Sequence, residues 1–261
     1  MHETIIKKLH EIEQDENIRI LLAVESGSRA WGFASPDSDY DVRFIYVHPL
    51  EWYLGLEKKR DVIERPINDD LDINGWDLSK TLQLLHKSNP TLFEWFSSPI
   101  IYIETEFAGR FREFMKEYYS NKSGLAHYLS MANSNYHAYL RGDMVRAKKY
   151  FYVLRPVLAC KWIMEKGSQP PMLFSELMEA ELAPEYVPIL NKLLDIKMNR
   201  PEIHEIPKIP ELNSYLEESI SEVHEQLKSM ENDQNDDWEA LNKLFLEEVT
   251  CKTGGIYEAV F

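Results

Sequence analysis

The amino-acid sequence predicts an α+β protein, in which a small mixed β-sheet flanked by helices is followed by a mostly helical domain. Up to about residue 100, short β-branched apolar runs alternate with segments of helical spacing. Beyond that point the apolar residues follow an almost wholly helical spacing. This change of pattern predicts two domains, residues 1–100 and residues 101–261. At 44% hydrophobic content, a chain of 261 residues can fill a real core.

The first half of the chain opens with an amphipathic helix over residues 3–14, because Ile5 and Leu9 lie on one face with their apolar neighbours. The β-branched run 18–24 predicts a buried strand, and residues 39–47 form a second one. The other elements expected here are a short helix starting near Gly27, a turn over 35–38, a short helix over 50–56, strands over 61–65 and 71–76, and helices over 78–87 and 90–95.

The second half is expected to be a helical domain. Between its last two helices lies the acidic, Asn-rich stretch 230–236, which predicts a mobile loop. The expected helices cover residues 107–119, 124–140, 143–166, 174–182, 184–198, 211–230 and 236–249.

Composition limits the kinds of partner. The net charge is −15, so the whole surface cannot attract nucleic acid, and any polynucleotide must be held by a local basic patch. No apolar run approaches the roughly 20 residues that span a bilayer, so no membrane partner is expected. The N-terminus is too polar for a signal peptide. Two distant cysteines, Cys160 and Cys251, are typical of a cytoplasmic protein with free thiols.

The most informative stretch is residues 27–41. Gly27 and Ser28 end the first strand at a helix start, where a backbone without a Cβ and free N–H groups can approach a phosphate. Ser28 adds a hydroxyl donor. Arg29 follows directly and is placed to reach phosphate as well, the alternative being a surface ion pair. A Gly-Ser pair alone is common in turns, so the assignment depends on the residues that come next.

Two aspartates open the second strand. Asp39 and Asp41 are two positions apart, so their Cβ atoms project from one face about 6.5–7 Å apart. Strands disfavour Asp, and two carboxylates on one face repel each other. A divalent cation such as Mg²⁺ offers a reason for them, since it takes a few carboxylates together with substrate phosphate oxygens. Arg43 shares this face and offsets part of the charge.

Gly27-Ser28, ten intervening residues, then Asp39-Tyr40-Asp41 resembles the signature of the polymerase-β-like nucleotidyltransferase superfamily. The wider context, GSRAWGFASPDSDYDVRFIYV and GWDLSKTLQLLHKSNPTLFEWFSSPIIY, is similar to predicted bacterial and phage nucleotidyltransferases associated with RNA-repair pathways. The resemblance covers most of the first 165 residues. Polar Ser26 departs from the apolar residue that is frequent before the Gly.

The resemblance implies a nucleotidyltransferase domain followed by a helical domain that completes the nucleotide cleft. It implies transfer of a nucleoside monophosphate from an NTP, with ATP the expected nucleotide, to a hydroxyl, with release of pyrophosphate. Mg²⁺ or Mn²⁺ is the implied cofactor, held by Asp39 and Asp41. The motif does not specify the acceptor, for which an RNA 3′ end is the leading candidate.

The resemblance further implies a third carboxylate on a neighbouring strand, which orients or deprotonates the attacking hydroxyl and shares in metal binding. Asp72 is the main candidate because it lies inside a predicted strand. Asp70 is typical of a turn, and Asp77 is well placed to cap the next helix. Glu64, on the preceding strand, is a lesser candidate.

A basic helix stands out in this acidic chain, with six basic residues and one acid over residues 141–164. Lys148, Tyr152 and Arg155 recur at i, i+4 and i+7, so they share a helical face. By resemblance, Lys148 or Lys149 contacts phosphates, with Tyr152 and Arg155 beside it. The alternative is a solvated basic face paired with acidic neighbours.

Two further classes of function remain open on the sequence. One is a non-catalytic module that binds a nucleotide or RNA on a degenerate transferase fold. The other is an antitoxin-like enzyme that adenylylates a partner protein. A tRNA end or a small molecule are further acceptors compatible with the motif.

Overall fold

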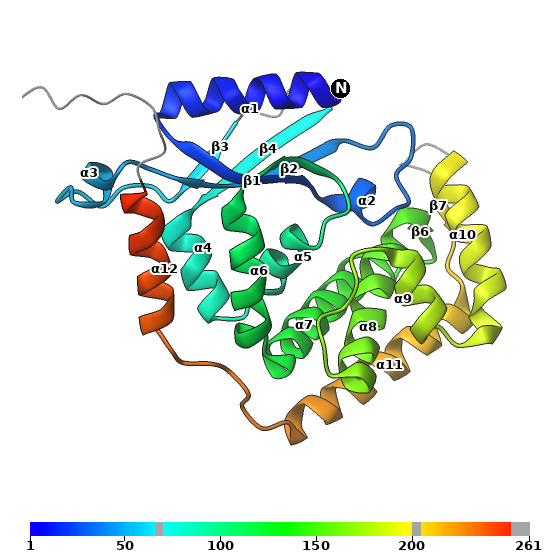
Figure 1. The fold of residues 1–261 in the computed structure, drawn as a ribbon. Helices are drawn as coiled ribbons and strands as arrows, with labels where there is room; N and C mark the ends of the chain where they lie inside the picture. Colours follow the sequence, from blue (N-terminus) through cyan, green and yellow to red (C-terminus); the bar gives the residue numbers. More distant parts are fainter. Residues whose placement is uncertain (66–69, 200–204, 252–261) are drawn as a thin grey trace, which may run out of the picture.

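The structure, a computed structural model, describes residues 1–65, 70–199 and 205–251. Its centre is a five-stranded sheet in the order β3-β4-β2-β1-β5 (Figure 1). β2 and β4 run parallel, and the other neighbours are antiparallel, which confirms the mixed sheet and the α+β class. The strands are β1 (Arg19–Glu25), β2 (Tyr40–Val47), β3 (Val62–Glu64), β4 (Leu71–Asp77) and β5 (Ile101–Glu104).

Helices cover both faces of this sheet (Figure 1). On one face, α1 (His2–Glu16) buries Ile5, Leu9 and Ile12 against the strands. The other face holds the larger core, because alternate strand residues such as Ile45 and Val47 point toward the helices there. The helices on that side are α4 (Leu78–His86), α5 (Pro90–Phe96), α6 (Glu106–Tyr118) and α12 (Glu239–Thr250).

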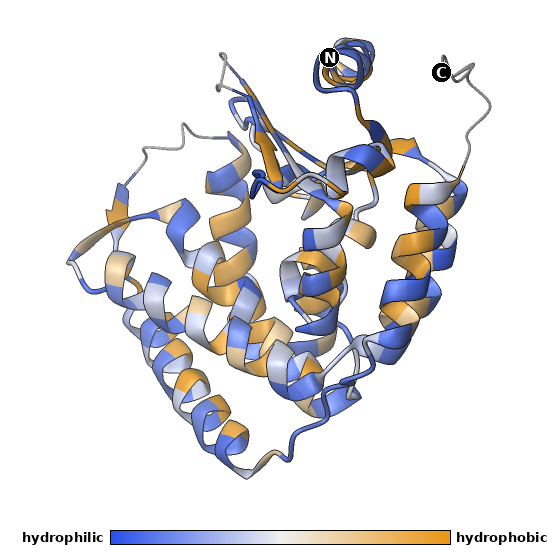
Figure 2. Cartoon of the chain, turned by 90° about the vertical axis from the view of Figure 1, so that its left-hand side faces the viewer, coloured by the Kyte–Doolittle hydropathy of each residue, from blue (hydrophilic) through white to orange (hydrophobic). Residues whose placement is uncertain are grey.

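The helical part is built around α8 (Ala147–Lys166), which is buried along most of its length and contains Pro156. A two-stranded sheet, β6 (Met144–Arg146) and β7 (Glu205–Pro207), lies beside its start. Hydrophobic residues gather on the inward faces of the helices, with hydrophilic ones outside (Figure 2). The surrounding elements are α7 (Asn121–Tyr139), α9 (Phe174–Glu181), the 3₁₀ turn η1 (Pro184–Tyr186), α10 (Val187–Asn199) and α11 (Pro210–Ser229).

The sequence patterns missed the three short strands β5, β6 and β7. β5 follows Pro99 at the edge of the sheet, and its residues are exposed or only half-buried, so no apolar alternation marks it. The helix expected from residue 143 begins at Ala147, because Met144–Arg146 pair with Glu205–Pro207. A strand pair of three residues is too short for its period to be visible in sequence.

The hydrophobic clusters do not divide at residue 100. α6 and α12 both contribute to the core beneath the sheet, although they follow that position in the chain. Glu248 on α12 is buried and accepts hydrogen bonds from Arg19 on β1 and Arg110 on α6, which fixes α12 to the first part of the molecule. Among the described residues, we therefore propose a first unit formed by 1–65, 70–118 and 239–250, and a second formed by the helices between 118 and 239.

The stretch 230–236, expected as a mobile loop, has specific contacts. The Asp233 carboxylate accepts hydrogen bonds from the Ser120 hydroxyl and from the first backbone N–H of α7. The Gln234 amide donates to the backbone carbonyl of His86. The segment connects α11 to α12, and after Met230 its residues are all polar or charged. Figure 2 shows it as a mostly hydrophilic connection between the two helices. The composition of the stretch did not reveal these caps, because they join residues more than 100 positions apart.

No helix in the described part of the chain combines the length and the apolar character that a membrane crossing needs.

His48, at the end of β2, gives a prediction for stability against pH. Burial lowers the pKa of its imidazole to about 4, from an ordinary value of 6.5, and its ring stacks on Trp52 with centroids 3.9 Å apart. Between pH 6.5 and pH 4 the His48 imidazole is protonated in the unfolded chain but stays neutral in the folded chain. Stability should therefore fall as the pH drops from 6.5 to 4, by about 3 kcal/mol in total.

Urea unfolding at pH 7 and pH 5 tests this expectation. His48→Phe keeps the stacking and removes the titrating group, so it should flatten the pH dependence. His137→Phe, at an exposed position of α7, serves as the control and should leave the slope unchanged. An equal slope in wild type and His48→Phe would contradict the assignment.

Candidate active site

Two carboxylates predicted from sequence lie side by side on the sheet. β2 and β4 are parallel neighbours, and Asp41 is the register partner of Asp72. Register partners in such a pair project from the same face. This is the face covered by α4, α5 and α6. Ile45 lies four positions after Asp41 on β2, so the two side chains share a face, and Ile45 packs against these helices. The structure thus brings Asp72, the main candidate for the third carboxylate, next to Asp41.

Arg43 joins these two carboxylates. Its Nη2 donates to Asp41 Oδ1 at 3.0 Å and to Asp72 Oδ2 at 2.8 Å, and its Nη1 donates to the Asp72 carbonyl at 3.2 Å. The Arg43 side chain is 18% exposed, so its charge is only partly screened by water. Arg43 therefore offsets the repulsion between the two acids and fixes one oxygen of each.

Asp39 comes directly before β2 and is exposed. The Arg29 guanidinium holds the chain at this point, since Nη2 donates to the Ser38 carbonyl at 2.7 Å and Nε to the Asp39 carbonyl at 3.1 Å. The same guanidinium lies over the Tyr40 ring, 3.7 Å from its centroid. Arg29 thus orients the segment that carries Asp39, a contact that the sequence analysis did not foresee.

Gly27 packs directly against the Asp41 carboxylate. A Cβ at this position would lie 2.1 Å from Asp41 Oδ2, and the backbone has φ +59°, which favours glycine. The Ser26 N–H donates to the Asp41 carbonyl at 2.8 Å, which ties the two segments together. Gly27 and Ser28 open the four-residue helix α2 (Gly27–Ala30). The expected cradle and the expected carboxylate are therefore in direct contact.

Glu25, which the sequence analysis missed, supports Asp41 from behind. It is fully buried at the end of β1, where it accepts the Asp41 N–H at 2.8 Å and the Tyr102 hydroxyl. Burial raises the pKa of the Glu25 carboxyl, and these hydrogen bonds oppose that rise. A Glu closing an apolar strand was the only sequence signal for it.

The other candidate carboxylates lie elsewhere. Asp77 is five positions beyond Asp72, at the far end of β4, and caps α4 by accepting the Ser79 N–H at 2.8 Å. Asp70 is an exposed turn residue before β4. Glu64 is exposed on β3 and forms an ion pair with Arg60. Asp72 alone of these four is beside Asp41.

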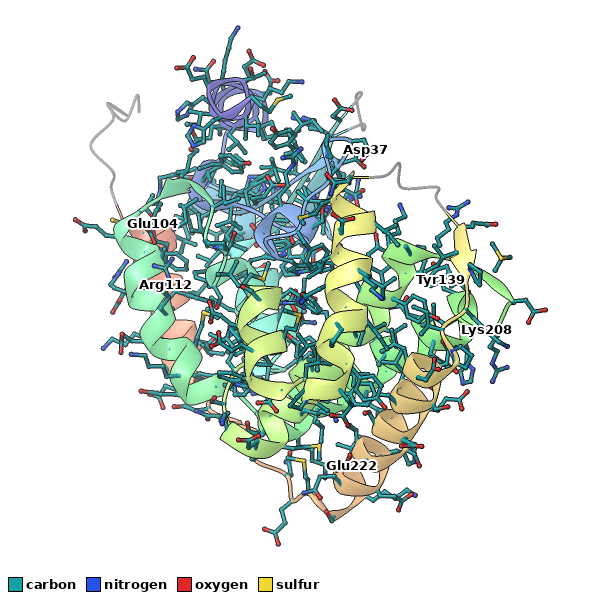
Figure 3. All side chains as sticks on the ribbon, turned by 90° about the vertical axis from the view of Figure 1, so that its right-hand side faces the viewer. Asp37, Glu104, Arg112, Tyr139, Lys208 and Glu222 are labelled. Atoms are coloured by element: carbon teal, nitrogen blue, oxygen red, sulfur yellow. The ribbon has the colours of Figure 1, made fainter. Side chains whose placement is uncertain are left out.

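The basic helix approaches the motif through aromatic residues. Trp31, just after α2, makes an edge contact with the Tyr152 ring of α8, with centroids 6.4 Å apart. The Lys149 ammonium lies between two rings, 3.9 Å from the centroid of Tyr139 and 4.4 Å from that of Tyr152. Lys148, which the sequence placed on the Tyr152 face, is half-buried. Tyr139 is 41% exposed at the surface of the helical part (Figure 3).

Arg155 lies in the interior, only 2% exposed. Its Nη1 donates to Glu94 Oε1 at 2.7 Å, and the Tyr128 hydroxyl donates to the same carboxylate. The guanidinium lies 4.8 Å from the Trp31 ring. The helical spacing that grouped Arg155 with Lys148 takes no account of Glu94 on α5. The ion pair with Glu94 holds the Arg155 side chain in the interior. Arg155 thus supports Trp31 and joins α8 to α5.

This ion pair yields a prediction. Arg155→Met leaves the Glu94 carboxylate largely buried without its cation and should lower the free energy of unfolding by roughly 3 kcal/mol. The double variant Arg155→Met, Glu94→Gln removes both charges and should recover most of the loss, as measured by urea unfolding. Wild-type stability in Arg155→Met, with only nucleotide binding impaired, would instead restore Arg155 to the nucleotide site.

A family model described as RlaP, RNA repair pathway DNA polymerase beta family, matches residues 1–247. The chain belongs to the RlaP family. This confirms the resemblance to polymerase-β-like nucleotidyltransferases and to their RNA-repair group, and the match extends well past residue 165, where the motifs become weak. The uncharacterized protein YcgL of Bacillus subtilis (strain 168) is 46% identical over 259 residues, which cover 98% of this chain and 100% of YcgL.

Among solved structures, a nucleotidyltransferase-like protein from Exiguobacterium sibiricum 255-15 is similar over 86% of this RlaP chain and 75% of its own. The TM-score is 0.32 at 12% identity. A score this low carries no argument, so membership of the RlaP family rests on the family model.

The carboxylates of this RlaP chain suit a divalent cation that brings ligands of its own. Burial raises the pKa of Asp41, Arg43 opposes the rise, and the charges of Asp72 and Asp39 add to it. Within the described ranges, no three His, Cys, Asp or Glu side chains form a ready metal cage. Mg²⁺ and Mn²⁺ accept hard oxygen ligands, and Mg²⁺ in particular is held by one or two carboxylates together with substrate phosphates. The donor set fits that mode of binding.

Proposed function

We propose that this RlaP protein is a nucleotidyltransferase that moves a nucleoside monophosphate from an NTP, with ATP the favoured one, to a hydroxyl acceptor and releases pyrophosphate. The proposed cofactor is Mg²⁺ or Mn²⁺, and the proposed setting is the cytoplasm, where NTPs and RNA are available. Membership of a polymerase-β-like family supports nucleotidyl transfer in general. The particular reaction is inferred from the site.

One observation carries the proposal. Asp41 and Asp72 are register partners on parallel strands, and Gly27 packs against Asp41 Oδ2. Two acids, held together by Arg43 and placed beside a backbone that has no Cβ, suit a site that receives a phosphate and its cation together. The paired acids repel each other, and a cation bound between them and the phosphate would relieve that repulsion.

The proposed roles follow from position. Asp39 and Asp41 hold the cation through their oxygens, and Asp72 shares in this and orients or deprotonates the attacking hydroxyl. When bound, a divalent cation lowers the charge on the phosphates and helps align the attacking and leaving oxygens. Arg43 and Glu25 keep Asp41 in place, the first through its side chain and the second through its backbone N–H.

The NTP is proposed to lie between α2 and the start of α8. Gly27 and Ser28 receive the β- and γ-phosphates, and Arg29 shapes the turn beside them. Lys148 and Lys149 supply positive charge, and Tyr152 offers a ring for the base or sugar. Arg155 is assigned a supporting role, because its guanidinium is buried against Glu94 and Trp31.

An RNA 3′ end is the proposed acceptor, in keeping with the RNA-repair description of the family. The charge of −15 argues for a short contact with RNA, since affinity for long nucleic acids grows with the number of cations on phosphates. A tRNA end satisfies this condition too. A protein hydroxyl or a small molecule is also compatible with the acidic charge, because neither needs a basic surface to bind phosphates.

The test is incubation with each α-labelled NTP and Mg²⁺ or Mn²⁺, in the presence of either total RNA or cell lysate. Label that appears on RNA 3′ ends and is absent with Asp41→Asn supports the proposal. Label on protein would instead identify a protein-adenylylating enzyme. No label with any NTP or acceptor, together with nucleotide binding, would identify a non-catalytic module and refute the proposal.

A further inference from the structure

The turn before Asp39 is organised by two buried serines. Ser35 and Ser38 are 2% and 4% exposed, and their hydroxyl oxygens lie 2.9 Å apart. The Ser35 N–H donates to Ser38 Oγ at 2.9 Å, and the Ser38 N–H returns to the Ser35 carbonyl at 3.0 Å. This closes a small ring of hydrogen bonds one residue before the first acid of the motif.

A lysine from far along the chain enters this ring. The Lys197 Nζ donates to Ser35 Oγ at 2.9 Å and to Ser38 Oγ at 3.4 Å. Lys197 is 5% exposed and lies on α10, where Leu190 and Leu193 occupy the same buried face at helical spacing. Lys197 thus lies at the C-terminal end of the buried face of α10, and its ammonium group contacts the Ser35–Ser38 turn. Asp37 belongs to this Ser35–Ser38 turn, and Figure 3 shows it beside the C-terminal end of α10.

The same turn is held from its other side by Arg29, through the carbonyls of Ser38 and Asp39. Two cations therefore fix this short segment, one from α2 and one from α10. Arg29 belongs to the motif itself, whereas Lys197 comes from 162 residues beyond Ser35. The turn before Asp39 is therefore in direct contact with the helical part.

We propose that Lys197 is a positioning residue of the metal site: it holds the Ser35–Ser38 turn so that Asp39 stays in line with Asp41. The inference rests on the proposed function, since it assumes that Asp39 and Asp41 bind the cation. It gives α10 a direct part in the site, because any movement of α10 relative to the sheet displaces the turn before Asp39.

The change Lys197→Met removes the ammonium group but keeps an unbranched apolar side chain, so it separates positioning from folding. Methionine fills nearly the same volume, and the serines keep their hydrogen bonds to each other, so the fold should persist. Lys192→Met is the matched control, because Lys192 lies on the same helix and is exposed. Lys197→Arg restores a cation, and Ser35→Ala removes the nearer acceptor from the opposite side of the contact.

Two quantities are measured in the full-length protein: Mn²⁺ affinity, from the EPR signal of free Mn²⁺, and kcat and KM for the NTP. A displaced ligand of about 1 Å costs up to a hundredfold in rate. We expect Lys197→Met and Ser35→Ala to lower Mn²⁺ affinity and kcat by about tenfold or more, with KM changed little. Lys192→Met should match wild type, and Lys197→Arg should recover part of the loss. The melting temperature of each variant is measured as well.

Wild-type Mn²⁺ affinity and kcat in both Lys197→Met and Ser35→Ala would overturn the proposal. So would a loss of activity that merely follows a fall in melting temperature, since that would make Lys197 an ordinary core residue. If the wild type transfers no nucleotide at all, the proposed function fails, while the Mn²⁺ titration still decides whether Lys197 shapes the metal site.

Discussion

Asp41→Asn is expected to reduce nucleotidyl transfer by at least about a thousandfold, which corresponds to about 4 kcal/mol of transition-state stabilisation. The change keeps the shape of the side chain and removes the charge that faces Gly27 and the cation. The fold should not suffer, because burial and the neighbouring acids already raise the pKa of Asp41 and disfavour its charged form. Single-turnover rates and urea unfolding, measured together, check both halves of the expectation.

Two further variants test which residue is the third carboxylate. Asp72→Asn should also be severely impaired, because Asp72 is the register partner of Asp41. Asp70→Asn should keep near-wild-type activity, since Asp70 is exposed in the turn before β4. The opposite order, with Asp70 essential and Asp72 dispensable, would show that the third carboxylate has been assigned to the wrong residue.

Gly27→Ala is expected to damage both activity and stability, although it adds only a single methyl group. The new Cβ would lie 2.1 Å from Asp41 Oδ2, and the positive φ at this position adds about 1–2 kcal/mol of backbone strain. The clash must push Asp41 away from Arg43 or push α2 away from the sheet. We expect at least a hundredfold loss of transfer and a lower melting temperature.

Gly109→Ala is the matched control for this prediction. Gly109 is exposed on α6, and a Cβ there would meet nothing within 4 Å. Alanine should therefore stabilise α6 by about 0.5–1 kcal/mol and leave activity unchanged. Equal effects of the two substitutions would mean that the close contact between Gly27 and Asp41 does not matter for function.

The carboxylate half of the site could be predicted because its signals are local. Gly27, Asp39 and Asp41 lie within one short stretch, and strand alternation alone placed Asp41 on one face. Asp72 required one further inference, that the strand following the polar turn is a neighbour of β2. The parallel pairing of β2 with β4 bears this out.

The supporting residues could not be predicted, because their partners are distant in the chain. Arg155 carries a helical-face signature, yet Glu94 on α5 turns it into a buried ion pair. Lys197 lies in a region where no motif is visible, and its contact with Ser35 exists only once α10 is docked. Periodicity reports which face of an element is apolar, and it says nothing about which charged group another element will bring to that face.

Nucleotidyl transfer by this protein is best tested by comparing α-labelled with γ-labelled NTP in parallel reactions, each with Mg²⁺ and the RNA acceptor. Nucleotidyl transfer predicts that the α-label becomes attached to the acceptor and that the γ-label leaves as pyrophosphate, both abolished by Asp41→Asn. Attachment of the γ-label to the acceptor would instead show phosphoryl transfer, and release of pyrophosphate that is unaffected by Asp41→Asn would rule out Asp41 as a catalytic residue.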